Sequence, residues 1–169
     1  QKDLGNTFRR IAEGGRNVFY EGEIAEEIAT FTRERDGLLT ADDLARYRAR
    51  WDEPIHVDYH GHRVYEMPPN SSGHILLQEL NLIEGFDIAG MGCLTPDSIH
   101  AMVEAKKLAF ADRERHVADP DWSSIPIQQM LSKEYASERA NRIDMEHAAQ
   151  AVTSGIPESE DETTCFTVA

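Results

Sequence analysis

The strongest structural signal in this 169-residue sequence is a long helical pattern of apolar residues near its middle. Thr95-Pro96-Asp97 opens the pattern, because proline is favoured at the first helical position, and Asp119-Pro120-Asp121 breaks it. We therefore predict a helix from about residue 96 to residue 117. The apolar residues that this helix carries are Ile99, Met102, Val103, Ala105, Leu108, Ala109 and Ala111.

Shorter patterns predict that the rest of the chain is also mainly helical, with one β-hairpin. Residues 54–59 and 63–67 alternate apolar and polar side chains, with His60-Gly61 as the turn between them. Thr40 is a suitable N-cap for a short helix with acidic residues in its first turn. No internal repeat or domain boundary is visible. Further helical patterns cover 3–13, 22–35, 73–84, 126–131 and 133–142.

The charge balance excludes one large class of partners. The formal net charge is −14 and the pI is near 4.8. A phosphate backbone must be met by clustered lysine and arginine side chains, so we expect no nucleic-acid partner. No apolar run approaches the roughly 20 residues that span a bilayer, so we also expect no membrane-spanning segment. Cys93 and Cys165 form neither a disulfide framework nor a C-x-x-C metal motif.

The C-terminal part of the sequence changes character twice. Residues 144–161 are rich in Ser, Gly, Pro and Glu, which predicts an exposed, mobile loop. Residues 163–169, Thr-Thr-Cys-Phe-Thr-Val-Ala, then read as a strand, which needs a neighbouring strand to satisfy its backbone. Because the chain also starts at Gln1 rather than at a methionine, we expect it to be an interior fragment of a longer protein.

Five motif-like segments follow one another along the chain. They are Gly14-Gly15 with Phe19-Tyr20-Glu21-Gly22-Glu23-Ile24-Ala25; Gly37-Leu38-Leu39-Thr40 with Asp43-Leu44 and Tyr47; Met67-Pro68-Pro69-Asn70-Ser71-Ser72-Gly73; Glu104 to Arg113 with Asp119-Pro120-Asp121; and Thr163 to Val168. In this order they resemble the gamma-glutamyltransferase family. Asn70, His74 and Cys165 depart from the family's usual residues. The resemblance covers nearly the whole chain. It implies that residues 1–162 are the second half of the large-subunit region, and that residues 163–169 begin the small subunit.

The same resemblance implies an α+β fold. The whole enzyme would be the four-layer αββα sandwich of N-terminal-nucleophile hydrolases. This fragment would be mainly helical, with a hairpin and a C-terminal strand that carries the nucleophile. Its apolar helix faces would pack against sheets from the rest of the enzyme.

Thr163 is the candidate nucleophile, and the Glu162-Thr163 bond is the candidate self-cleavage site. A hydroxyl needs an adjacent general base, and an N-terminal threonine carries one in its own α-amine, whose pKa is about 8. Taken alone, Thr163-Thr164 would more often be ordinary surface strand residues. The upstream motifs favour the nucleophile, which by resemblance acts on gamma-glutamyl amides such as glutathione, with water or an amino acid as acceptor.

Two other functions remain open. One is a related amidase or acylase that acts on a beta-lactam side chain or a poly-glutamate. The other is a helical fragment without chemistry of its own. The resemblance also implies that the oxyanion stabilisers and most substrate contacts lie on other segments of the large/small subunit heterodimer, so we expect this chain alone to be inactive.

We assign no substrate-binding residue and expect no cofactor. By family analogy the location is periplasmic or extracellular, although a cytoplasmic one stays open.

Several other polar residues have simpler structural interpretations. Ser71 and Ser72 precede a helix, which favours capping over lining a site. His56, His60 and His62 are close in sequence, but Gly61 turns the chain among them, so we expect no metal site. We expect Glu104 and Lys107 to pair along one helix, and Asp112-Arg113 to belong to a salt-bridged or half-buried packing helix. Asp119 and Asp121 are expected in a turn, and Cys165 as a half-buried strand residue.

Overall fold

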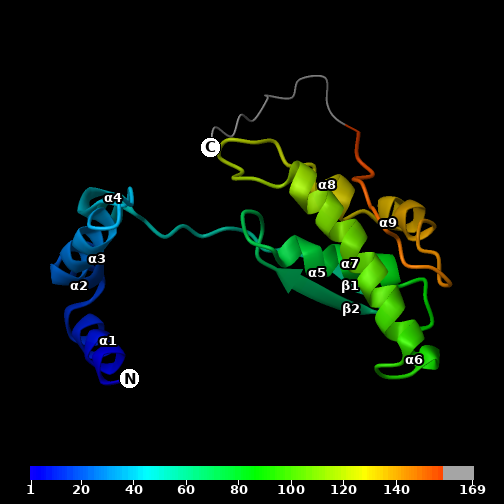
Figure 1. Cartoon of the computed structure of the whole chain (residues 1–169), viewed down its shortest axis with the longest axis horizontal. Coiled ribbons are helices and arrows are strands. Elements are labelled where there is room, and N and C mark those ends of the chain that lie inside the picture. The colour runs from blue at the N-terminus through cyan, green and yellow to red at the C-terminus, as the bar shows by residue number, and fades with distance from the viewer. Residues whose placement is uncertain (158–169) are drawn as a thin grey trace. The chain divides into compact units, whose positions relative to one another are not determined.

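The computed structural model describes residues 1–157, and it divides into two compact units. The N-terminal unit contains residues 1–51 and the C-terminal unit starts at Asp52. The first contains helices α1 to α4, and the second contains a hairpin and further helices, as labelled in Figure 1. The sequence shows no sign of this division. Residues 158–169, with Glu162, Thr163, Cys165 and the expected C-terminal strand, lie outside the described residues.

The N-terminal unit contains α1 (Lys2–Gly14), α2 (Arg16–Tyr20), α3 (Glu23–Arg33) and α4 (Ala41–Arg46). Three of these helices match the sequence prediction, and α2 is an addition. Gly15 separates α1 from α2 with a φ of 68°, a conformation that glycine adopts without steric cost. Thr40 caps α4 as expected: its side chain accepts from the Asp43 amide, and the Asp43 carboxylate accepts from the Thr40 amide.

The C-terminal unit opens with the predicted hairpin, β1 (Ile55–Tyr59) paired antiparallel with β2 (His62–Glu66). His60 and Gly61 form the turn, and both have a positive φ. The pairing places Val57 opposite Val64 and Asp58 opposite Arg63. Two hydrogen bonds then join the Arg63 guanidinium to the Asp58 carboxylate. The alternating pattern therefore gave both the strands and their turn.

The core of the C-terminal unit lies where α5 (Gly73–Ile83) packs on α7 (Pro96–His116) and on α9 (Lys133–Ala140). The sequence predicted all three helices to within a few residues. The short helices α6 (Ile88–Met91) and α8 (Ile127–Met130) complete the unit. The fold is therefore α+β and mainly helical, as expected. The core residues are Ile75, Leu82, Ala105, Leu108 and Ala109, with partly buried Ile83, Phe110, Ala140, Ile143 and Val152 against them.

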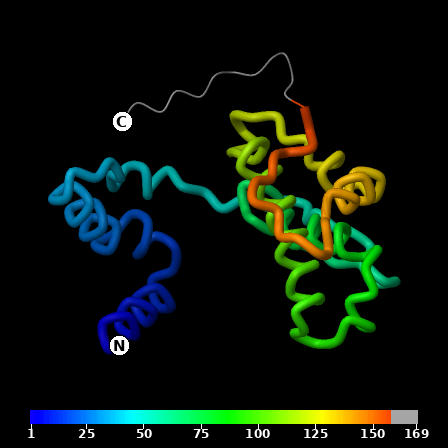
Figure 2. The backbone as a smooth tube through the Cα atoms, turned by 45° about the vertical axis from the view of Figure 1, so that its right-hand side comes forward, coloured from blue at the N-terminus to red at the C-terminus, as the bar shows by residue number. Residues whose placement is uncertain are grey.

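After α9 the chain runs back along α7 without regular secondary structure, as Figure 2 shows in orange. We call residues 144–157 the leader segment, because they precede the predicted processing bond. The irregular conformation agrees with the sequence prediction, but a free, mobile loop does not describe it. Val152 packs against the core, and several backbone groups of the segment are hydrogen-bonded to helix side chains. Among the described residues, no helix is long and apolar enough to cross a membrane.

Candidate functional site

The predicted processing bond, Glu162-Thr163, lies outside the described residues. The structure therefore describes only the chain that precedes this bond. The leader segment ends five residues before Glu162. How the fold holds this segment is therefore the part of the candidate site that the geometry can describe.

The first half of the leader segment is held by polar side chains from the N-terminal half of α7. The His100 ring Nε2 donates to the Asp144 carbonyl at 2.8 Å. Glu104 accepts from the Ala149 amide at 3.2 Å, and Lys107 donates to the Ala149 carbonyl at 3.0 Å. Lys107 also pairs with Glu104 at 2.6 Å, as the sequence predicted. One residue of the leader thus has both its backbone groups bound by an ion pair on α7.

Glu104 is 3% exposed, so the charge of its carboxyl group depends on these partners. Burial alone would raise its pKa, because it disfavours the charged form. The hydrogen bonds from Lys107 and from the Ala149 amide outweigh burial and hold the pKa below its ordinary value. The carboxylate is therefore ionised at neutral pH and acts as a fixed acceptor for the leader backbone.

The second half of the leader is held near the C-terminal end of α7. The Asp112 Oδ1 atom accepts from the Gly155 amide at 3.0 Å. The Arg139 side chain, from α9, donates to the Thr153 carbonyl at 2.9 Å. A hydrogen bond of 2.8 Å joins His116 Nε2 to the Ser154 hydroxyl. Three consecutive leader residues, from Thr153 to Gly155, are therefore bound by side chains of α7 and α9.

Asp112 is the centre of this second attachment, and its side chain is fully buried. Gln78, from α5, donates to Asp112 Oδ2 at 2.5 Å, and Arg139 approaches Oδ1 at 3.4 Å. The same Arg139 nitrogen also reaches the Leu108 carbonyl at 3.3 Å. A buried carboxylate needs such partners, because an unpaired charge away from water is costly. Asp112 thus joins three helices and the leader segment at one point.

Tyr135, on α9, also belongs to the group of buried polar residues around Asp112 and is 7% exposed. Burial, together with the negative charge of Asp112, raises the pKa of its phenol well above the ordinary value. The phenol therefore stays neutral at physiological pH. A Cβ atom built on Gly155 would lie 2.6 Å from both the Tyr135 hydroxyl oxygen and Arg139 Cδ, so a larger residue here would force the leader or these side chains to shift.

Sequence reasoning missed this attachment, although it contained a usable signal. Asp112 was assigned to a packing helix, and its burial and ion pair with Arg139 agree with that. What was missed is that the same cluster binds the leader backbone. His100, Glu104 and Lys107 recur at the three- and four-residue spacing of one helical face, which indicates a polar partner for that face. Asp112 and His116 lie on another side of the same helix, so this spacing does not point to them. Arg139 gives no comparable local signal, since only folding brings α9 to α7.

The turn before α5 carries the two serines that were predicted to cap it. The Ser71 hydroxyl makes hydrogen bonds within this turn: it accepts from the Gly73 amide at 3.3 Å and donates to the Met67 carbonyl at 3.0 Å. Ser72 occupies the N-cap position, but within the described residues its side chain accepts no cap hydrogen bond. His74 is fully buried, which lowers the pKa of its imidazole, and its Nδ1 donates to the Ser71 carbonyl.

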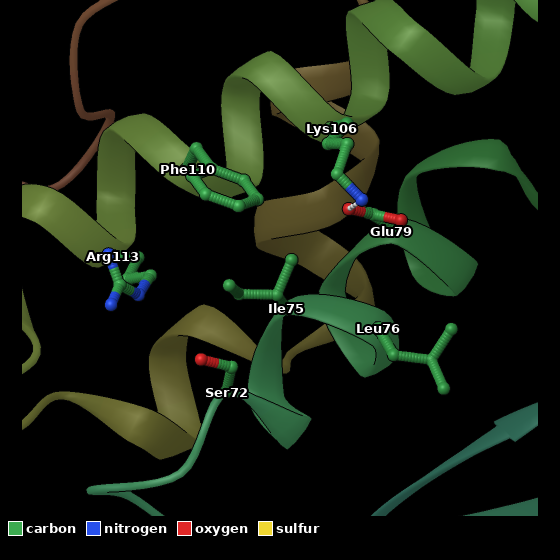
Figure 3. A pocket seen from close by; sticks show the side chains of 7 residues that line it. All are labelled: Ser72, Ile75, Leu76, Glu79, Lys106, Phe110 and Arg113. Atoms are coloured by element: carbon green, nitrogen blue, oxygen red, sulfur yellow. Dashed lines mark ion pairs between the residues drawn. The ribbon is translucent and has the colours of Figure 1, made fainter.

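Ser72 instead lines a pocket of about 390 Å³ between α5 and α7 (Figure 3). Ile75 and Phe110 point into it, and Lys106 and Glu79 form an ion pair of 3.4 Å at one end, opposite Arg113. Arg113 therefore faces the pocket, whereas its neighbour Asp112 faces the leader segment. The pocket and the leader attachment lie on different faces of α7.

The remaining candidates have structural roles. Among the described residues no group of three His, Cys, Asp or Glu side chains could hold a metal ion, which includes His56, His60 and His62. The Asp119 side chain accepts from the Asp121 amide, and its carbonyl accepts from the amides of Trp122 and Ser123, as expected for a turn.

Comparison with known proteins gives a consistent result. Residues 1–169 match the family model described as gamma-glutamyltranspeptidase. The glutathione hydrolase proenzyme of Escherichia coli K12 is 43% identical over 149 residues, which are 88% of this chain and 26% of that protein. The crystal structure of Helicobacter pylori gamma-glutamyltranspeptidase superposes with a TM-score of 0.81 at 31% identity, covering 97% of this chain and 48% of that one.

A further similarity concerns a protein with a different name. The crystal structure of cephalosporin acylase from Bacillus halodurans has a TM-score of 0.71 at 44% identity. The match covers 82% of this chain and 26% of that one. The chain thus spans between about a quarter and a half of the length of these three matched chains.

Proposed function

Because this chain belongs to the gamma-glutamyltranspeptidase family, we propose that it is part of a self-processing gamma-glutamyl transferase or hydrolase whose nucleophile is Thr163. The observation that carries the proposal is the match of the family model across residues 1–169, which includes Thr163 and the bond before it. In this proposal residues 1–162 are the C-terminal half of the large-subunit region, and residues 163–169 begin the small subunit of an αββα sandwich.

The first reaction would be self-cleavage. The Thr163 hydroxyl attacks the Glu162 carbonyl carbon, the peptide C–N bond breaks, and the Thr163 nitrogen takes up a proton as it becomes a free amine. The resulting ester links Glu162 to the threonine oxygen. Water hydrolyses this ester, which gives a carboxylate at Glu162 and restores the hydroxyl. The new α-amine of Thr163 can then serve as the general base for that hydroxyl.

The second reaction would use the same hydroxyl on a gamma-glutamyl amide of the glutathione type. The hydroxyl attacks the gamma-carbonyl carbon, and the amine leaves with a proton to give a gamma-glutamyl ester of Thr163. Water as acceptor gives hydrolysis, and the amino group of an amino acid gives transpeptidation. Other segments of the same enzyme would supply the donors that stabilise the oxyanion, each of which is typically worth about 100-fold or more in rate.

Substitution of Thr163 in the full-length protein tests this proposal. We expect Thr163→Ala to leave a single intact chain with no gamma-glutamyl hydrolysis, whereas the matched control Thr164→Ala is still cleaved. Intact-mass measurement should show a break between Glu162 and Thr163 in the wild-type protein. An uncut wild-type chain that is folded and full-length would contradict the proposal.

The similarity to cephalosporin acylase favours one alternative, a related acylase with the same nucleophile and a different amide substrate. The two functions are separated by comparing kcat/KM of the wild-type protein for a gamma-glutamyl anilide and for a beta-lactam with an amide side chain. A preference for the beta-lactam would reject the gamma-glutamyl function but keep the role of Thr163. Loss of neither activity in Thr163→Ala would reject both.

A further inference from the structure

We propose that Asp112 and Arg139 are positioning residues for self-cleavage, because they fix the leader segment at Thr153 and Gly155, the latter only seven residues before Glu162. This inference rests on the proposed function. It concerns a step before the mature enzyme exists, and it assigns no part in turnover to either residue.

The first support is that both side chains contact the backbone of the leader segment rather than its side chains. Asp112 and Arg139 bind backbone atoms of the leader, the Gly155 amide at 3.0 Å and the Thr153 carbonyl at 2.9 Å. Backbone contacts fix the path of the chain, whatever the leader side chains are. A buried ion pair that served the core alone would need partners only within the helices.

The second support is the rigidity of the attachment. The Asp112 side chain is fully buried, and the Arg139 side chain is 8% exposed. Gln78 holds the second Asp112 oxygen, so α5, α7 and α9 all contribute. A carboxylate held from three helices cannot follow a leader segment that moves, and the leader must therefore come to it.

The third support is the close fit at Gly155. The backbone passes so near Tyr135 and Arg139 that an added Cβ would lie 2.6 Å from each. Such a distance forces a shift of the leader or of these side chains. Gly155 therefore offers a way to disturb the attachment from the leader side, without removing a buried charge.

The position of the attachment sets the size of the effect. Gly155 lies seven residues before Glu162, and Ala149, the nearest residue bound by the first attachment, lies thirteen residues before it. Loss of the whole second attachment, from Val152 to Gly155, would therefore move the last bound residue from seven to thirteen residues before Glu162. Because the probability of bringing chain ends together falls as about the 3/2 power of length, such a loss should slow cleavage by up to about 2.5-fold.

The test uses Gly155→Ala and Asp112→Asn in the full-length protein, with the rate of self-cleavage followed by intact mass. We expect both variants to be cleaved more slowly than wild type, by up to about 2.5-fold. Gly85→Ala is the matched control, because a Cβ there meets nothing within 4 Å. His100→Ala is the second control, because it releases only Asp144, the farthest attachment from the bond, and leaves the attachment at Gly155 intact. Both controls should be cleaved at the wild-type rate.

A second measurement separates positioning from general damage. Each variant is also produced as two co-expressed chains, one ending at Glu162 and one starting at Thr163, so that no cleavage is needed. The proposal expects wild-type kcat and KM for this two-chain form of Gly155→Ala and Asp112→Asn. Equal losses in the one-chain and two-chain forms would show a merely structural role and overturn the inference.

The outcomes for the two proposals are distinct. If Thr163→Ala is still cleaved, the proposed function fails. If Thr163→Ala blocks cleavage but Gly155→Ala and Asp112→Asn are cleaved at the wild-type rate, the proposed function stands and the positioning role is wrong.

Discussion

The two units of the molecule are both mainly helical, but they differ in what their side chains bury. In the N-terminal unit the buried described residues are Ile24, Ala25 and Ala29, all on α3, while Leu4 and Phe8 of α1 are 46% and 61% exposed. In the C-terminal unit α5 and α7 bury apolar and polar residues alike, among them Leu82, Gln78 and Asp112.

The difference shows two ways of specifying helices. The N-terminal helices are defined by local signals, such as the Gly15 break and the Thr40 capping box. The C-terminal helices are also defined by contacts between residues far apart in sequence, such as Gln78 with Asp112 and Arg139 with Thr153. We therefore expect substitutions of buried residues to be costly in the C-terminal unit, and substitutions in the N-terminal unit to have small, local effects.

The largest expected effect follows removal of the Asp112 carboxylate. Asp112→Ala leaves Arg139 buried without its anionic partner, which typically costs about 3–5 kcal/mol. The measurement is amide hydrogen exchange in α5, α7 and α9. Glu23→Ala is the control in the N-terminal unit, because the Glu23 side chain is 85% exposed and pairs only at the surface with Arg10. An equal loss of protection in the two variants would refute the contrast between the units.

A matched pair of leucines tests apolar burial in the same way. Leu82 is 1% exposed and Leu4 is 46% exposed. Leu82→Ala should destabilise the C-terminal unit by about 3 kcal/mol, through lost transfer free energy and a residual cavity. Leu4→Ala should change the stability of the N-terminal unit by about 0.5 kcal/mol or less. The comparison is read from exchange rates in α5 and α1, and a large effect of Leu4→Ala would show that α1 has a packing partner.

A smaller effect is expected at two helix N-caps. The Thr40 side chain caps α4, whereas the Ser72 side chain, within the described residues, caps nothing on α5. Thr40→Ala should cost about 1 kcal/mol in the N-terminal unit, because an amide of the first turn loses its acceptor. Ser72→Ala should have a clearly smaller effect. Exchange of the first-turn amides of α4 and α5 measures both, and equal effects would mean that local capping does not distinguish the units.

The smallest expected effect is on stability at acidic pH. The hydrogen bond from Lys133 holds the Glu84 pKa below its ordinary value of 4.5, with a further bond from the His60 amide. A carboxyl whose pKa is lowered by folding stabilises the fold fully above its unfolded pKa. That stabilisation is lost as the pH falls through the folded value. Stability of the C-terminal unit should therefore decrease below about pH 4.5, and Glu84→Gln should make that decrease shallower.

Asp43 is the local counterpart of Glu84. Its pKa is also lowered, by hydrogen bonds from the Thr40 side chain and backbone. Urea denaturation between pH 6 and pH 3, followed by circular dichroism and by exchange in each unit, compares them. Glu84→Gln should change the pH dependence of the C-terminal unit only. A change in both units would contradict their independence in this range.

Much of the secondary structure was predictable because its signals are local. Glycine and proline mark the ends of α1 and α7, Thr40 begins α4, and alternation at residues 55–59 and 62–66 gives the hairpin. The short helices α2 and α6 were missed because five- and four-residue helices contribute few residues to a periodic pattern, although the equally short α8 lies within the predicted range 126–131. The division after Trp51 was missed because no change of composition accompanies it.

The candidate site likewise has features that the sequence predicted and features that it did not. The sequence alone determined the family, the order of the motifs and Thr163 as the candidate nucleophile, because these depend on residue identity and spacing. Only the tertiary structure decided that residues 144–157 are held on α7, and that Asp112 and Arg139 hold them. The physical reason is that Asp112 and Arg139 are 27 residues apart, and their buried charges become partners only when α9 packs beside α7.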